Sequence, residues 1–220
     1  MYKIEELFDL DKTQAKEYLS KYEYPWQALK GISEFIIELG NKLDKNEYTQ
    51  IKENVWVHKT AKIMESVYIN EPAIIGENVE IRHCAFIRGS ALIGKDCVVG
   101  NSCELKNVIL FEHCEVPHFN YVGDSILGYK AHMGAGSITS NFKADHKNIN
   151  VSCDEEVVET GLRKIGAMIG DYSEIGCNAV LNPGTIIGRN CIIYPTACVR
   201  GTVKENTIYK NDGTTKGKQD

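Results

Sequence analysis

An aliphatic residue recurs at every sixth position from Val57 to Leu105 of this 220-residue chain. The series is Val57, Ile63, Ile69, Ile75, Ile81, Ile87, Ile93, Val99 and Leu105. Neither regular structure produces this spacing, because a helix repeats its apolar face about every 3.6 residues and a strand about every 2. A period of six therefore indicates a short strand and a turn, repeated many times, and such an internal repeat constrains the fold more than any other feature.

The same ladder returns near the C-terminus. Its aliphatic positions are Ile169, Ile175, Leu181, Ile187, Ile193 and Val199. The position four residues after each aliphatic is small in both ladders, as in Ala61, Ala85 and Ala179, which predicts packing inside a tight corner. Glycine often follows the aliphatic residue, as at Gly76 and Gly94, and we expect it to supply backbone angles that a repeated sharp corner needs.

The spacing changes between the two ladders. After Leu105 one step shortens from six to five, giving Leu110, Val116 and Val122, and a second short step gives Leu127, Met133 and Thr139. Residues 140–164 then leave the pattern as a long polar loop, and Asn148–Thr160 within it favours a hairpin. A long loop on a rigid repeat is a usual place for binding groups.

This pattern resembles the hexapeptide-repeat, left-handed parallel β-helix, from roughly Val57 to Val203. In that family three hexapeptides form one triangular coil whose aliphatic side chains point inward. The resemblance implies an all-β solenoid, and its left-handedness comes from the family and not from the period. We expect a helical N-terminal segment (1–50), a β-helix (51–205) with an inserted loop (140–164), and a polar tail (206–220).

The first fifty residues lack the six-residue period. After Pro25, apolar residues recur at helical spacing: Trp26, Leu29, Ile32, Phe35, Ile36 and Leu39. This predicts an amphipathic helix that ends near Gly40 or Asn41. Its apolar stripe needs a partner: the open first coil, a neighbouring subunit or a separate domain. Solenoid ends need caps, so a cap on the first coil is the preferred interpretation.

Composition excludes several classes. The net charge of −5 and the lack of a basic block argue against a nucleic-acid binder. There is no run of eighteen apolar residues and no apolar signal-peptide core, so we expect a cytoplasmic protein with no membrane span. Of eight cysteines, Cys97, Cys103, Cys114 and Cys191 fall in the small inward position, and no C-x-x-C occurs. All eight are predicted to be reduced thiols, with no metal site.

The segment from Val116 to Phe142 carries the candidate chemistry. It contains H-x-x-Y-x-G-D, with His118, Tyr121 and Asp124, and then GAGSITSN, which ends at Asn141. These motifs resemble the acetyltransferase half of the bifunctional enzymes that acetylate glucosamine-1-phosphate and then uridylylate it. The resemblance implies that His118 is the general base and that Tyr121 and Asn141 contact the amino sugar.

Two upstream cations match the same family. The resemblance implies that Arg88 and Lys106 bind the substrate phosphate, and Lys106 keeps the family spacing to His118. Independently, Arg88 and Lys106 are eighteen residues apart, one full coil, so they should stack on one outer face, where a bound phosphate would offset their repulsion. The alternative is two solvated surface cations. Lys147, on the loop, is a further candidate for a sugar phosphate, or a solvated loop lysine.

His118 by itself fits several interpretations. A lone outward histidine is usually an ordinary surface residue, whereas a neutral imidazole with a pKa of about 6.5 suits general-base catalysis on an amine. Asp124 is a candidate to orient its ring. A metal cluster of His113, Cys114 and His118 is disfavoured, because Cys114 occupies an inward position.

Acetyl-CoA is the co-substrate that the resemblance implies. In this fold it lies in the groove between neighbouring prisms of a homotrimer, beside the C-terminal coils. Small outward residues would let the pantetheine arm approach the backbone, so Ala135 and Ala167 are candidate contacts. Ala179 is a further family-like candidate, although it counts as inward. Arg200 and Lys204 are candidates for the nucleotide phosphates.

The loop after Asn141 is longer than in the bacterial bifunctional enzymes. It resembles the archaeal sugar-1-phosphate nucleotidyltransferases, whose G-R-R-K-x-G-A exit corresponds to 161–167 here, while a nucleotidyltransferase G-x-G-T-R stretch is absent. The predicted function is acetyl-CoA-dependent N-acetylation of an amino-sugar phosphate, glucosamine-1-phosphate or galactosamine-1-phosphate. One alternative is a non-catalytic trimeric module that partners or regulates a separate nucleotidyltransferase. The other is an acyltransferase for a different amine or hydroxyl acceptor.

Overall fold

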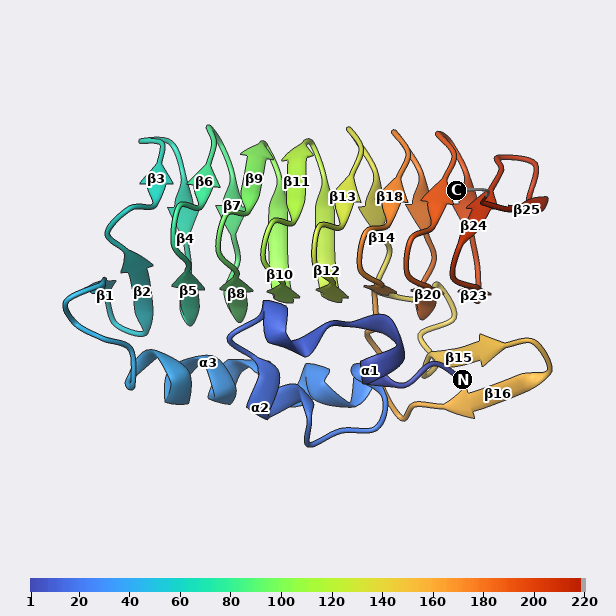
Figure 1. Ribbon diagram of the computed structural model, residues 1–220, viewed down its shortest axis with the longest axis horizontal. Coiled ribbons are helices and arrows are strands. Elements are labelled where there is room, and N and C mark those ends of the chain that lie inside the picture. The colour runs from blue at the N-terminus through green and yellow to red at the C-terminus, as the bar shows by residue number, and fades with distance from the viewer. Residues whose placement is uncertain (219–220) are drawn as a thin grey trace.

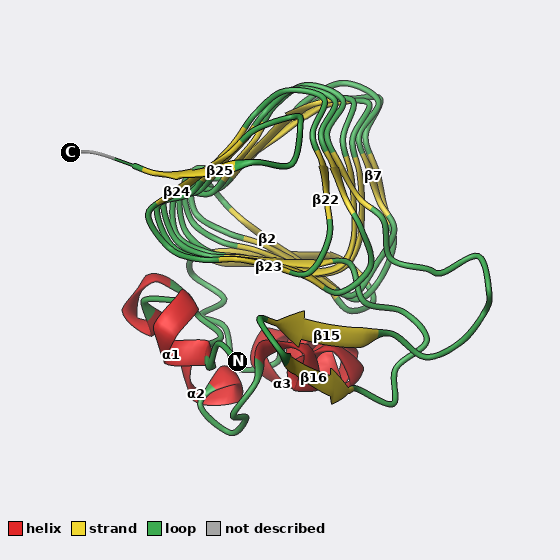
Figure 2. Ribbon diagram, turned by 90° about the vertical axis from the view of Figure 1, so that its right-hand side faces the viewer, coloured by secondary structure: helices red, strands yellow, loops and turns green. Residues whose placement is uncertain are grey.

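The chain forms a three-sided parallel β-helix with a helical segment packed along one side (Figure 1). This computed structural model describes residues 1–218. The predicted fold class is confirmed. Figure 2 looks along the axis from the C-terminal end, and the chain runs clockwise through the three faces as it approaches the viewer. That sense of winding is left-handed, as the resemblance implied.

Each face of the prism is a stack of short parallel strands, and we name each face by a feature of it. The covered face contains β2 (Val55–His58), β5 (Ala73–Ile75), β8 (Ala91–Ile93), β17 (Ala167–Ile169), β20 (Thr185–Ile187) and β23 (Thr202–Val203). The β9 face contains β3 (Lys62–Ile63), β6 (Glu80–Ile81), β9 (Val98–Asn101), β11 (Glu115–His118), β13 (His132–Met133), β18 (Glu174–Ile175), β21 (Ile192–Ile193) and β24 (Thr207–Tyr209).

The third face, the β7 face, is joined to the covered face by two long strands. It contains β4 (Tyr68–Ile69), β7 (Phe86–Ile87), β14 (Ile138–Thr139), β19 (Val180–Leu181) and β22 (Cys198–Val199). The strands β10 (Glu104–Leu110) and β12 (Tyr121–Leu127) begin on the β7 face and bend onto the covered face. We call this bend the site corner.

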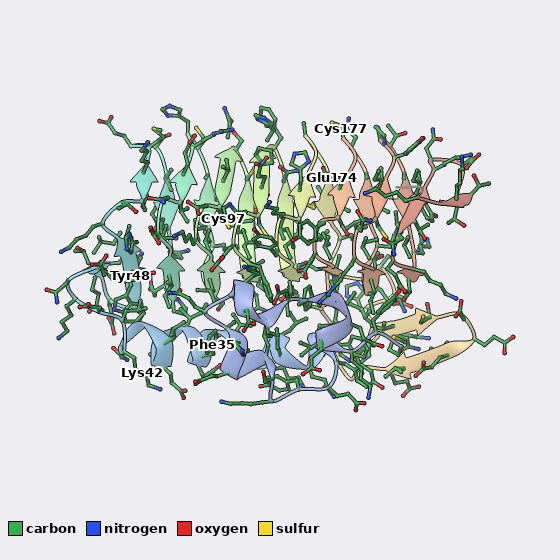
Figure 3. All side chains as sticks on the ribbon, viewed as in Figure 1. Phe35, Lys42, Tyr48, Cys97, Glu174 and Cys177 are labelled. Atoms are coloured by element: carbon green, nitrogen blue, oxygen red, sulfur yellow. The ribbon has the colours of Figure 1, made fainter. Side chains whose placement is uncertain are left out.

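The ladder residues fill the prism. From Ile75 to Val199 almost all are fully buried, and stacked aliphatic residues pair directly, as Ile75 does with Ile93. Cys97 lies inside the prism, whereas Cys177 lies at the outer edge (Figure 3). None of the eight cysteines is paired with another.

Glycine serves the corners in a different way from the one expected. Gly76 and Gly94 do not adopt positive φ, but a Cβ on either would lie 2.8 Å from a carbonyl oxygen of the next coil. Glycine is needed there because the backbones approach closely. Positive φ occurs instead two residues later, at Asn78 (54°) and Asp96 (56°), residue types that tolerate the left-handed region.

The two short steps change the coil length at one corner. A regular coil spans 18 residues, since Ile75 pairs with Ile93, whereas Leu105 pairs with Val122 across 17. Both residues are lost at the site corner, and the next coil opens there into the long loop. The loop carries the expected hairpin, formed by antiparallel β15 (Asn150–Cys153) and β16 (Glu156–Glu159).

The N-terminal segment lies along the covered face and not over the first coil, so the preferred cap interpretation is wrong (Figure 2). It comprises α1 (Ile4–Leu7), α2 (Lys16–Leu19), α3 (Ile32–Gly40) and the 3₁₀ helices η1 (Leu10–Lys12) and η2 (Pro25–Gly31). The reason is that the outward positions of the covered face are apolar: Ile74, Leu92, Ile109, Ile126, Met168 and Ile186 are all buried. Burying such side chains contributes about 1.5–3 kcal/mol each.

A carboxylate fastens this segment to the β-helix. Asp171 accepts hydrogen bonds from the backbone N–H groups of Asp9 (2.7 Å) and Tyr129 (2.8 Å), and Arg189 Nε lies 3.5 Å from it. Burial raises the pKa of Asp171, while the two N–H donors act against that rise.

One face of the solenoid carries an antiparallel edge strand at each end. At the start β1 (Tyr48–Lys52) pairs antiparallel with β2, and at the other end β25 (Thr215–Gly217) pairs antiparallel with β24. No helix within residues 1–218 is long and apolar enough to cross a membrane.

Candidate functional site

The site corner brings several of the candidate residues together. Phe86 pairs with Glu104, and Glu104 pairs with Tyr121, so three successive coils present their side chains in register. The same register places Arg88 beside Lys106. Both cations already have a carboxylate: Arg88 Nη1 lies 2.9 Å from Glu104 Oε1, and Lys106 Nζ lies 2.8 Å from Asp124 Oδ1. Their mutual repulsion is therefore balanced without a phosphate.

Asp124 is the centre of this corner. Its side chain is buried and accepts hydrogen bonds from Lys106 Nζ, from Asn107 Nδ2 at 2.9 Å and from Asn141 Nδ2. Its backbone carbonyl accepts the N–H of Gly166, where the chain returns from the long loop. We call Asp124, Lys106, Asn107 and Asn141 the Asp124 cluster. It joins three coils and both ends of the loop.

Tyr121 lies beside Asn141 on the β7 face. A Cβ on Gly123 would lie 2.5 Å from Tyr121 Oη and 2.8 Å from Asn141 Nδ2, so glycine lets the two side chains meet. Burial raises the pKa of Tyr121, and the nearby carboxylates of Asp124 and Glu104 add to the rise. The phenol is therefore a neutral hydrogen-bonding group at physiological pH.

His118 stands apart from this cluster. It ends β11 on the β9 face, in register with Asn101, and its imidazole is exposed. Among residues 1–218 no side chain makes a hydrogen bond or ion pair with that ring, so the expectation that Asp124 orients it is wrong. Asp124 is occupied by its own three donors. The segment from Tyr121 to Asp124 crosses the β7 face and spans roughly 10 Å along the strand. His118 lies just before the edge of the face at which this segment begins.

The remaining candidates are scattered. Ala135 is partly exposed on the coil above His118, whose carbonyl accepts the N–H of Gly136. Ala167 does not face outward as expected, because it occupies the inner small position of β17, in register with Thr185, and is fully buried. Ala179 is also fully buried, as its inward count indicated.

The candidate cations of the loop and the C-terminal coils make no hydrogen bond or ion pair with the Asp124 cluster within residues 1–218. Lys147 is exposed on the loop. Arg200 directly follows β22. The strand pairs β12–β14, β14–β19 and β19–β22 place it three coils beyond Gly123 along the solenoid axis, roughly 14 Å away at about 4.8 Å per coil. Lys204 lies 2.9 Å from Asp154 of the hairpin and so contacts the loop. Within residues 1–218 no three His, Cys, Asp or Glu side chains gather as a metal site.

A cleft next to the Asp124 cluster was missed from the sequence. It holds about 500 Å³ and is lined by Leu29, Lys30, Asn107, Asp124, Phe142, Leu162, Arg163 and Lys164. The G-L-R-K exit was noted as a resemblance, but nothing in the sequence placed it beside Asp124. Lys30 carried no signal, because its position depends on how η2 docks on the covered face.

Known proteins share this repeat. A protein-family model described as bacterial transferase hexapeptide (six repeats) matches residues 166–201. The chain is 33% identical to the bifunctional protein GlmU of Methanococcus maripaludis strain C5 over 215 residues, which are 96% of this chain and 52% of that protein. Over 176 residues it is 34% identical to a bifunctional sugar-1-phosphate nucleotidylyltransferase/acetyltransferase of Sulfurisphaera tokodaii, covering 80% of this chain and 43% of that protein.

The chain thus spans about half the length of the relatives it matches. Among solved structures, the polySia-specific acetyltransferase NeuO aligns with a TM-score of 0.49 at 13% identity, covering 72% of this chain and 80% of that one. The resemblance predicted from the repeat and the motifs is confirmed by the family model and by the two bifunctional relatives.

Proposed function

Because the chain carries the hexapeptide repeat of bacterial transferases, we propose that it is an acetyltransferase that transfers an acetyl group from acetyl-CoA to an amino-sugar phosphate. Glucosamine-1-phosphate and galactosamine-1-phosphate are the favoured acceptors. The observation that supports this most is the similarity over 96% of the chain to a bifunctional GlmU protein, together with the polar corner formed by its motif residues. We further propose a cytoplasmic homotrimer, with acetyl-CoA in the groove between subunits.

The proposed chemistry uses His118, just before one edge of the β7 face, and two residues on that face. His118 takes a proton from the acceptor amine as the nitrogen forms a bond to the thioester carbonyl carbon, and the carbon–sulfur bond then breaks to release CoA. Its ring is exposed and free of intramolecular partners among the described residues, so it is available to a substrate. Tyr121 and Asn141 supply hydrogen bonds to the sugar from the middle of the face.

Binding both substrates on one rigid surface accounts for much of the proposed rate, because it removes the entropic cost of a bimolecular encounter. The β-helix suits this role. The strands that carry the candidate residues are paired on both sides and their inward neighbours, such as Leu105 and Val122, are fully buried.

The test is CoA release from acetyl-CoA with glucosamine-1-phosphate or galactosamine-1-phosphate. We expect activity in the wild-type protein and a loss of roughly 10²–10⁴-fold in His118→Ala, the range for a general base. His83→Ala removes another exposed histidine and serves as the matched control. Equal activity of wild type and His118→Ala would refute the general-base role.

Absence of CoA release with either acceptor would count against the whole proposal. A trimer without activity that captures a sugar nucleotidyltransferase would support the regulatory-module alternative, and activity only on other amines or hydroxyls would support a different acceptor. Size measurement and an acceptor panel separate these outcomes.

A further inference from the structure

Buried polar side chains inside the β-helix gather under the candidate site. One of them, Asn120, follows His118 by two residues and occupies the small inward position of its coil. The buried residues stacked at that position, coil by coil, are Ala85, Cys103, Asn120, Ser137 and Ala179. Asparagine is the largest and most polar of the five, and a buried polar group is unfavourable unless it is hydrogen-bonded. Its presence here therefore depends on the partners that it finds.

The side chain of Asn120 is fully hydrogen-bonded. Its Oδ1 accepts the backbone N–H of His118 at 3.0 Å. Its Nδ2 donates to the backbone carbonyls of Gly134, at 2.8 Å, and Ser137, at 3.0 Å, on the next coil. A flipped amide would bring N–H against N–H and oxygen against oxygen, so the partners determine its orientation. One buried side chain thus joins the backbone of His118 to the coil that follows.

The backbone on both sides of His118 is fixed by these contacts. The His118 carbonyl accepts the N–H of Gly136 at 2.9 Å, from the same turn of the next coil that Asn120 holds. Phe119 has φ of 52°, a region that bulky residues rarely enter unless the surroundings hold them there. Its N–H donates to the Asn101 carbonyl of the preceding coil at 2.9 Å. The chain therefore turns sharply after His118, and neighbouring coils hold the turn from both sides.

The His118 ring depends on that backbone more than a partnered ring would. It is exposed, and no side chain among residues 1–218 makes a hydrogen bond or ion pair with it. A general base must lie within about 2.6–3.2 Å of the group whose proton it takes. With no side chain to orient the ring, the position of the Cα atom and the direction of the Cα–Cβ bond decide where the ring can reach.

We propose that Asn120 is a positioning residue for His118. It lies inside the prism and touches no substrate, and it acts by holding the backbone from which the proposed general base projects. This inference rests on the proposed function and adds the means by which a histidine without side-chain partners keeps a defined position. A displacement of about 1 Å in a catalytic geometry can lower the rate about 10²-fold. Loss of Asn120 should therefore lower kcat, while Tyr121 and Asn141 still hold the sugar.

A double-mutant cycle separates positioning from general damage to the site. CoA release would be measured for the wild type, Asn120→Ala, His118→Ala and the variant with both changes, using the better acceptor of glucosamine-1-phosphate and galactosamine-1-phosphate. We expect Asn120→Ala to lower kcat roughly 10–100-fold, with the KM of each substrate changed less than about twofold. In the His118→Ala background the same change should alter kcat less than about twofold, because the ring through which Asn120 acts is absent.

Two further variants allow for a loss of stability. Ile75→Ala removes a fully buried ladder residue of β5, on the covered face, and we expect a lower Tm with unchanged kcat. Asn120→Ser is the milder change at the site, since serine already occupies the same position at Ser137, where its hydroxyl donates to the Gly134 carbonyl. Its shorter side chain withdraws the acceptor from the His118 N–H, so kcat should fall although Tm falls less than in Asn120→Ala.

Residue-resolved hydrogen exchange tests the contact without turnover. The His118 N–H should exchange at least about tenfold faster in Asn120→Ala and Asn120→Ser than in the wild type, because its acceptor is removed. The Phe119 N–H, which donates to the Asn101 carbonyl, is the internal reference and should change less.

The outcomes are distinct. An equal fractional loss of kcat in the wild-type and His118→Ala backgrounds would overturn the inference, since Asn120 would then act on the site as a whole. Unchanged exchange of the His118 N–H in both Asn120 variants would also overturn it. If the wild type releases no CoA with either acceptor, the acetyltransferase proposal fails. Faster exchange at His118 in the Asn120 variants would then still uphold the assignment of Asn120 as the residue that holds His118.

Discussion

Replacing Asp124 by alanine should be the most damaging single change at the site corner. The Asp124 carboxylate is buried and accepts hydrogen bonds from Lys106, Asn107 and Asn141, so its loss leaves a half-buried ammonium and two amides without their acceptor. Removing one partner of a buried ion pair costs about 3–5 kcal/mol. Asp124 also has φ of 49°, and alanine in that region costs a further ~1–2 kcal/mol.

Asp96→Ala isolates the backbone contribution. Asp96 has the same left-handed conformation on another corner, with φ of 56°. Within residues 1–218 its partly exposed side chain accepts one hydrogen bond, from Asn78 at 3.0 Å, and lies 3.6 Å from His113 Nε2. We expect about 1–2 kcal/mol of destabilisation there. The difference between the two variants, about 3–5 kcal/mol, measures the Asp124 cluster alone.

Thermal unfolding at one fixed protein concentration would measure both variants. For a chain of this size each kcal/mol lowers Tm by roughly 2–4 °C, so Asp124→Ala should melt on the order of 10 °C below Asp96→Ala. Asp124→Asn should fall between them, because asparagine tolerates the left-handed region and keeps one acceptor oxygen. Equal Tm values for Asp124→Ala and Asp96→Ala would refute the idea that the cluster stabilises the corner.

Three other predictions concern the core, the N-terminal segment and the thiols. Ile87→Ala should lower stability by about 2–5 kcal/mol in chemical unfolding, because Ile87 is fully buried, whereas the outward neighbour change Phe86→Ala should cost about 1 kcal/mol. Gly40→Ala should destabilise by about 1–3 kcal/mol and change tryptophan fluorescence, since its Cβ would overlap the Trp56 ring; an unchanged Tm would contradict this packing. At pH 8 a thiol reagent should modify the exposed cysteines quickly and the buried ones only after unfolding. Burial raises the pKa of Cys191 to about 11 and raises the pKa of Cys114 well above its usual range. Both thiols are therefore protonated at pH 8 and lack the reactive thiolate. The fast group should be Cys84, Cys177 and Cys198, and rapid reaction of Cys114 would disagree with its burial.

The six-residue period was sufficient to predict the solenoid, because the inward aliphatic at each coil is set by the repeat itself. It also located the two short steps, since Leu110 and Leu127 occupy the inward positions that the count required. The hairpin after Asn148 followed from local alternation. Each of these features depends on residues close together in the sequence.

The position of the N-terminal segment could not be predicted in this way. Its apolar stripe was evident, but its partner is the outward side of the covered face, where Ile74 and Leu92 were counted only as neighbours of ladder residues. The repeat marks which residues point inward and does not show which outer face is also apolar. Lys30 was missed for the same reason, since its place in the cleft depends on that docking.

At the candidate site the register was predictable and the pairing was not. Eighteen-residue spacing placed Arg88 next to Lys106. The carboxylates that neutralise them come from Glu104 in β10 and Asp124 in β12, and the coil from β10 to β12 is one residue shorter than a regular coil. The inward position of Ala167 was misjudged because it follows the long loop, where the six-residue count restarts.

One antiparallel strand at each end bears on how the stack of coils could be extended. A stack of parallel coils offers an unpaired strand edge at each end, and another copy could in principle add its own coil there and extend the stack into a fibre. Both β1 and β25 run against the direction of the coils, so a further coil would meet a strand of the wrong polarity. On one face at each end, the repeat that makes this architecture easy to elongate is therefore terminated by a short reversal that hinders the addition of another coil.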